Sequence, residues 1–82
     1  MTYATNVTNL NNPPKAFLLN TATTPIGFPT RLDGNACCVI QQNLGSGAYV
    51  SQLAFGFGSD RIAIRRKNGS SNWTDWKYIT AQ

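Results

Sequence analysis

Apolar and polar residues alternate most clearly in the last third of the chain. Leu53, Phe55 and Phe57 share one parity, whereas Ile62 and Ile64 share the other. Alternate residues of a strand project to the same face, so each segment is predicted to be a strand with one apolar face. The two apolar faces coincide in a hairpin only if the connecting loop has an even number of residues.

Two hairpin registers satisfy this condition. A two-residue turn at Ser59-Asp60 places Phe55 opposite Ile64, and a four-residue loop places it opposite Ile62. In either register we expect the apolar face to belong to the core. The opposite face combines basic with small residues, so long side chains could lie flat on it or another chain could approach closely. Its members are Gln52, Ala54, Gly56, Arg61, Ala63 and Arg65.

Other short segments are predicted to be strands by their apolar content. The first covers residues 16–19, the second residues 37–41, a third begins near Tyr49 after the Gly45-Ser46-Gly47 loop, and the last covers residues 76–80. The second is apolar without strict alternation, so it is predicted to be central. No amphipathic helix of ordinary length fits. The sequence therefore predicts a mainly β fold, a small antiparallel sheet or sandwich of about five short strands.

Residues 1–14 differ from the rest because they are rich in Asn and Thr and end at Pro13-Pro14. Asn and Thr are poor helix formers and proline blocks continuation of a helix, so this stretch is predicted to be mostly irregular, with at most a short helix. We interpret it as an N-terminal arm or linker. Residues 15–82 are then the β domain.

Composition bounds the chemistry of this 82-residue chain. A domain of this size buries only about 60% of the surface that its unfolded chain exposes, so it needs a further source of stability. Cys37 and Cys38 are adjacent, which disfavours a disulfide between them. Without His or Glu, and with Asp33, Asp60 and Asp75 scattered, neither a metal, a cofactor nor an enzyme is expected. Association with other copies of the chain is therefore the remaining source of stability.

Seven basic and three acidic residues give a net charge of +4, and five of the basic residues follow residue 60. This stretch could contact nucleic acid, acidic glycans or lipopolysaccharide phosphates. Alternatively, Arg65-Arg66-Lys67 is a solvated strand end that discourages strand addition. A nucleic-acid-binding module should expose several aromatic residues on its basic face, and we count at most two, so no nucleic acid is expected. No apolar run could span a bilayer, so membrane insertion is not expected either.

Trp73 and Trp76 are three residues apart, so an extended chain would send them to opposite faces. One interpretation is an aromatic platform for a sugar ring, with polar groups of Arg65, Asn72 and Asp75 nearby. The other is that both indoles anchor the last strand to the core. The candidate glycan ligands are Arg65, Trp73, Asp75 and Tyr78.

Several short motifs occur in a characteristic order over about residues 15–80, and this order resembles the knob-type domain of bacteriophage tail fibres and R-type pyocin fibres. In that family an I-x-x-R strand is followed by a glycine-containing turn and a W-x-x-W-x-x-I/L ending. A Pro-x-Gly stretch often opens the family pattern, where this chain has Pro13-Pro14-Lys15. The matching residues are Phe17 to Leu19, Cys38 to Gln41, Ile62 to Arg65, Gly69, and Trp73 to Ile79.

The resemblance implies a knob-like domain at the tip of a tail fibre, assembled as a parallel homotrimer with the rest of the fibre. Residues 1–14 would then be the arm or linker to an upstream fibre shaft. It implies a receptor-binding function in host adsorption, with a bacterial surface polysaccharide, lipopolysaccharide or capsule, as the partner. Such a protein would belong to a phage virion or a tailocin and would be assembled in the bacterial cytoplasm. The alternative is a structural trimerisation or capping domain without direct receptor contact.

Overall fold

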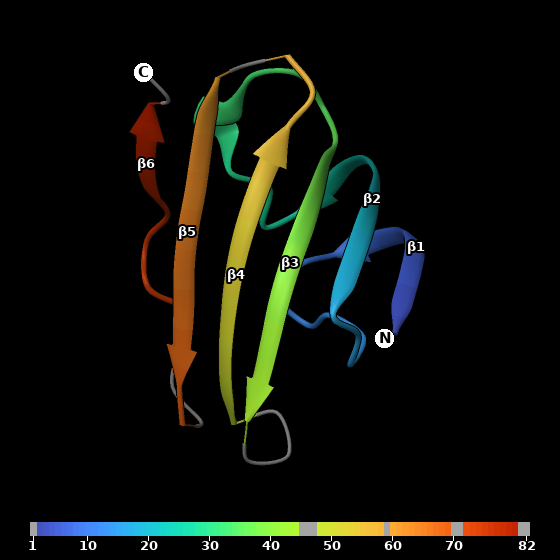
Figure 1. The fold of residues 1–82 in the computed structure, drawn as a ribbon, viewed down its shortest axis with the longest axis vertical. Coiled ribbons are helices and arrows are strands. Elements are labelled where there is room, and N and C mark those ends of the chain that lie inside the picture. Colours follow the sequence, from blue (N-terminus) through green and yellow to red (C-terminus); the bar gives the residue numbers. More distant parts are fainter. Residues whose placement is uncertain (1, 45–47, 59, 70–71, 81–82) are drawn as a thin grey trace.

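The computed structural model describes residues 2–44, 48–58, 60–69 and 72–80. Six strands form one sheet whose spatial order equals the chain order, with β1 and β6 at its edges (Figure 1). The helix within these ranges is the short 3-10 helix η1 (Thr30–Leu32). The predicted mainly β class is confirmed, with six strands in place of about five. The strands are β1 (Tyr3–Asn9), β2 (Leu18–Ile26), β3 (Cys37–Leu44), β4 (Tyr49–Gly56), β5 (Arg61–Asn68) and β6 (Lys77–Thr80).

The hairpin formed by β4 and β5 has the register of the four-residue loop. Phe55 lies opposite Ile62, and Leu53 lies opposite Ile64. The predicted strands near β3, β4 and β6 are also present, and β3 pairs antiparallel with both of its neighbours. The predicted Gly45-Ser46-Gly47 loop lies outside the described residues.

The prediction of a mostly irregular N-terminal stretch is wrong. Residues 3–9 form β1, which pairs in parallel with β2, and β-branched Thr and Val favour this extended backbone. Two parallel strands require a crossover between them. Residues 10–16, which we call the strap, make part of this crossover. Val7 and Leu10 are buried in the core, so the N-terminal stretch contributes to the folded unit. Its attachment to an upstream shaft stays a prediction.

The hydrophobic core lies on the opposite face of the sheet from the one predicted. The strap and residues 27–36 cross on one side of β3 and β4 (Figure 1), and the buried side chains lie between these segments and the sheet. Phe57, expected in the core, is 73% exposed. The sets of residues that share a face were therefore predicted correctly, but the wrong face was predicted to belong to the core. The core residues are Val7, Leu10, Ala16, Leu19, Leu32, Cys37, Val39, Ala54 and Ala63.

Small residues on the covered face let the crossing segments approach the sheet closely. Ala54 lies directly opposite Ala63. At Gly56, an added Cβ atom would lie 3.0 Å from the carbonyl oxygen of Leu32 and 3.1 Å from its Cβ atom. The close approach that the sequence suggested is thus made by η1 of the same chain.

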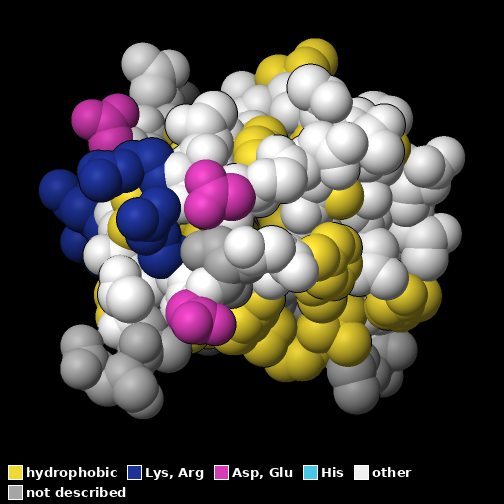
Figure 2. Space-filling view, turned by 90° about the horizontal axis from the view of Figure 1, so that it is seen from above, with side chains coloured by type: hydrophobic (Ala, Val, Ile, Leu, Met, Phe, Trp, Pro, Cys, Tyr) yellow, Lys and Arg dark blue, Asp and Glu magenta, His cyan; other side chains and the backbone are white. Residues whose placement is uncertain are grey.

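The other face of the sheet carries two rows of apolar side chains. Neighbours in each row are directly opposite one another on adjacent strands. Ile64 is 39% exposed and Ile79 is 55% exposed, whereas the other six are half-buried. Seen from above, hydrophobic side chains gather along one side of the molecule (Figure 2). We call this surface the outer patch: Leu18, Ile40, Leu53 and Ile64 in one row, and Cys38, Phe55, Ile62 and Ile79 in the other.

Candidate functional site

Three polar side chains lie side by side on the covered face. Gln41, Gln52 and Arg65 are direct neighbours on β3, β4 and β5, and all three are buried. Gln52 Nε2 donates to Gln41 Oε1 at 2.9 Å, and Arg65 Nε donates to Gln52 Oε1 at 2.9 Å. Buried polar groups are stable only when they are hydrogen-bonded, and this polar row meets that condition.

The polar row holds the strap against the sheet. Gln41 Nε2 donates to the carbonyl oxygens of Pro14 at 2.9 Å and of Ala16 at 3.1 Å. Gln52 Nε2 and Arg65 Nη2 both donate to the carbonyl oxygen of Leu10, at 3.1 and 2.9 Å. The strap cannot complete a sheet ladder on this face, so side chains supply the donors that its carbonyl groups need.

Arg65 lies between the two tryptophan rings. Its guanidinium carbon is 4.1 Å from the ring centroid of Trp73 and 4.4 Å from that of Trp76. Each indole N–H is also used, because Trp73 Nε1 donates to the carbonyl oxygen of Asn11 at 3.0 Å and Trp76 Nε1 to that of Gly27 at 2.9 Å. The tryptophans therefore clamp the crossing segments over Arg65, and cation–π attraction stabilises the stack.

The expectation that the two indoles lie on opposite faces is wrong. Strict alternation holds only along a continuous strand, and residues 74–76 are not part of one. Trp73 forms an isolated bridge with Lys67, and β6 begins only at Lys77. The chain between them turns enough to place both rings on the same guanidinium.

Burial sets the protonation of two groups on this face. It lowers the pKa of the Arg65 guanidinium to about 10, so the cation persists at neutral pH. It raises the pKa of the buried Cys37 thiol to about 11, so Cys37 is a neutral core residue. Among the described residues, no group of three or more His, Cys, Asp or Glu side chains could hold a metal ion. No helix in the same ranges is long and apolar enough to cross a membrane.

Next to the tryptophan clamp, an open hollow of about 420 Å³ lies at the molecular surface. The half-buried indole of Trp73 and the side chain of Lys67 form part of its wall, with Lys67 Nζ 5.8 Å from the indole centroid. Asn11 from the strap and Asn72 from the segment after β5 also line it, and both are exposed. An aromatic ring, two amides and an ammonium group thus face one small volume.

Of the four residues predicted as glycan ligands, the structure brings Arg65 and Trp73 into contact, whereas Asp75 and Tyr78 are not among the described residues that line the hollow. Arg65 is 6% exposed and bonded within the chain, so we assign it a structural role. Trp73 lines the hollow. Asp75 is exposed in the segment between Trp73 and β6. Tyr78 instead contacts η1, where its ring lies 5.5 Å from the Arg31 guanidinium and its hydroxyl accepts from the Arg31 backbone N–H at 3.4 Å.

Two residues of the hollow were not identified as ligands from the sequence. Lys67 was considered only as one of the basic residues after residue 60 and as part of a strand end, and Asn11 was placed in the N-terminal arm. Asn11 is 62 positions from Trp73 along the chain, and their contact depends on the crossover of the strap. No local pattern encodes such a long-range contact. The I-x-x-R strand followed by two tryptophans was the one available signal for this region.

Comparison with protein-family models, with curated proteins and with solved structures gives no significant match to this chain.

Proposed function

We propose that this chain is a receptor-binding domain at the tip of a phage or tailocin tail fibre, and that it attaches to a bacterial surface polysaccharide. The observation that carries this proposal is the hollow beside Trp73. Sugar rings present C–H groups that pack on indole and hydroxyl groups that bond to amides. The hollow offers both kinds of group within about 420 Å³. The resemblance of the W-x-x-W-x-x-I segment to fibre knobs supports the same function.

The indole wall of the hollow is held in place by contacts within the chain. Trp73 is held by its N–H bond to Asn11 and by the stack on Arg65, which is itself bonded to Gln52 and Leu10. A preorganised wall loses little conformational entropy when a ligand binds, which favours affinity in a small open site. Three copies in a homotrimeric fibre tip would repeat a weak contact and raise its avidity.

Adsorption to bacterial cells tests this function. The tagged domain, fused to a trimeric carrier, is incubated with a panel of bacteria whose surface is treated with periodate or with protease. We expect retention by some strains, loss after periodate because it cleaves sugar diols, and retention after protease. Loss after protease with retention after periodate would indicate a protein receptor. Absence of retention on every strain would contradict recognition by this domain.

A pair of asparagine variants locates the contact. Asn72→Ala removes an exposed amide of the hollow, and we expect it to weaken adsorption about 3- to 10-fold, as for the loss of one hydrogen bond. Asn35→Ala is the matched control, because Asn35 is also exposed but does not line the hollow. Trp73→Ala is a poorer test, since it also removes a wall of the Arg65 stack. Equal adsorption by both asparagine variants and the unmodified chain would place the contact elsewhere.

A structural role in fibre assembly is the second candidate, and the outer patch is the observation that favours it. Strands are about 4.8 Å apart, so the two rows cover on the order of a few hundred Å², the size of the largest apolar patch on a typical monomer, which is often functional. We propose that the patch contacts further copies of this chain in a homotrimer. Neither proposal requires a nucleic acid, a metal or a cofactor.

A further inference from the structure

The hollow beside Trp73 has an unbalanced charge. Among the described residues that line it, Lys67 is the one basic side chain and none is acidic. Its other members, Asn11 and Asn72, are neutral amides. The Lys67 ammonium is therefore the charge that these residues present to the hollow, and it favours an anionic ligand.

Lys67 is also placed to act together with the ring. It is half-buried, and its Nζ atom lies 5.8 Å from the Trp73 centroid. A partly buried ammonium interacts more strongly with an anion than a fully solvated one, because water screens it less. If the anionic group of a sugar paired with Lys67, the sugar ring that carries this group would lie close to the indole.

We propose that the hollow binds an acidic saccharide, meaning a sugar residue that carries a carboxylate or a phosphate group. The anionic group pairs with the Lys67 ammonium, the C–H face of the ring packs on Trp73, and the hydroxyl groups bond to the amides of Asn11 and Asn72. This assignment rests on the proposed polysaccharide-binding function and narrows it to one class of polysaccharide. Nucleic acid also carries phosphate, but a single indole in a hollow of about 420 Å³ offers no extended stacking surface.

Binding to chemically paired polymers tests the proposal. Capsular and lipopolysaccharide-derived bacterial polysaccharides are immobilised in native form, after reduction of their carboxylates to alcohols, and after removal of their phosphates with hydrogen fluoride. The trimeric-carrier fusion is applied at physiological salt. We expect binding to native acidic polymers and at least about a tenfold loss when the anionic group is removed, as for the loss of a charged hydrogen bond. The treatment that abolishes binding identifies the anion as carboxylate or phosphate.

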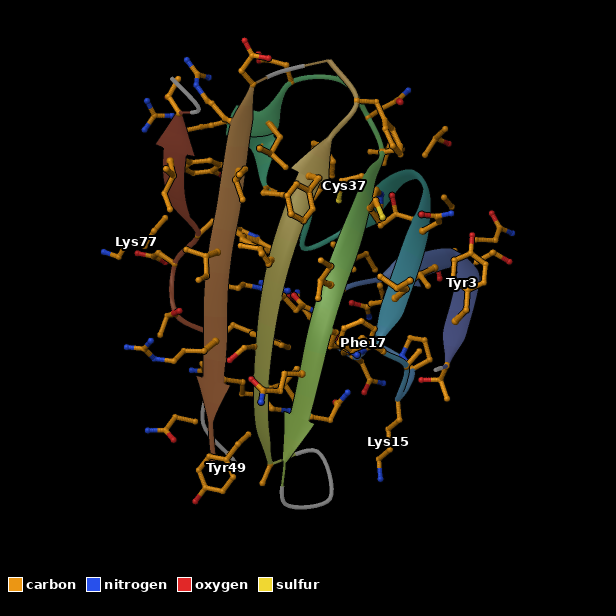
Figure 3. The ribbon with its side chains drawn as sticks, viewed as in Figure 1. Tyr3, Lys15, Phe17, Cys37, Tyr49 and Lys77 are labelled. Atoms are coloured by element: carbon orange, nitrogen blue, oxygen red, sulfur yellow. The ribbon has the colours of Figure 1, made fainter. Side chains whose placement is uncertain are left out.

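Two lysine variants with the same change of net charge separate local pairing from bulk attraction. Lys67→Gln should lower the affinity for native acidic polymers about tenfold. Lys15→Gln should change it less than about twofold, because Lys15 does not line the hollow and extends from the chain just before β2 (Figure 3).

The possible failures are distinguishable. Equal losses in the two lysine variants would overturn the assignment of Lys67, since only net charge would then matter. Equal binding to native and neutralised polymers would overturn the acidic class while leaving polysaccharide recognition intact. Absence of binding across all polymers would overturn the proposed function together with this inference.

Discussion

At the scale of single residues, Arg65 has the largest predicted effect on stability. It joins the polar row to the tryptophan clamp and donates to Gln52 Oε1 and to the Leu10 carbonyl oxygen. Its removal would leave a buried amide oxygen without its donor and two indoles without the cation between them. The sequence placed Arg65 on a solvated strand end or in a glycan site. Parity alone could not show that the strap would cover this strand.

We expect Arg65→Ala to lower the free energy of unfolding by about 2–4 kcal/mol, the range for loss of a buried, charged hydrogen-bonding group. Urea denaturation followed by tryptophan fluorescence measures it. Arg66→Ala is the matched control, because Arg66 is the next residue and is exposed, and its effect should be within about 0.5 kcal/mol. Similar values for the two variants would contradict a structural role for Arg65.

At the scale of elements, packing of η1 on the sheet depends on the absence of a side chain at Gly56. A Cβ atom there would lie 3.0 Å from the Leu32 carbonyl oxygen, a backbone atom that cannot rotate away. At Gly58, two residues further on, an added Cβ atom would meet nothing within 4 Å. The two glycines are therefore a matched pair in chemistry but not in packing.

We expect Gly56→Ala to destabilise the fold by about 1–3 kcal/mol, as for an overpacked core position. Gly58→Ala should lie within about 0.5 kcal/mol of the unmodified chain. Thermal unfolding monitored by circular dichroism compares them. If the order of the two effects were reversed, η1 would not lie against β4 as described.

The sequence predicted strands well because alternation is local. The positions of β4 and β5, and the even-numbered loop between them, follow from residue parity, whereas β3 and β6 were predicted from short apolar segments. Which face would be covered could not be read from parity. The phenylalanine and isoleucine face had the greater hydrophobicity, but Ala54, Gly56 and Ala63 have the small volumes that let another segment approach. The strand β1 was not predicted because its segment is rich in polar Asn and Thr residues. It forms a strand only through its pairing with β2.

At the scale of the whole molecule, the two faces of the sheet have different roles. The covered face buries the polar row and holds the strap, which places Asn11 beside Trp73. The outer patch leaves Ile64 and Ile79 exposed beside half-buried apolar neighbours. We assign recognition to the hollow and assembly to the outer patch. A homotrimer joined through this patch would gain the burial that an 82-residue chain lacks, and would present three hollows together.

The solution mass of the purified domain, measured by light scattering over a range of concentrations, tests this account most directly. We predict a mass near three times 8.9 kDa for the unmodified chain. Ile64→Lys, in the outer patch, should reduce it to one chain, whereas Ile26→Lys should leave the trimer intact, since Ile26 is 59% exposed and lies outside the patch. A mass of one chain at every concentration, or a trimer unaffected by Ile64→Lys, would contradict assembly through the outer patch.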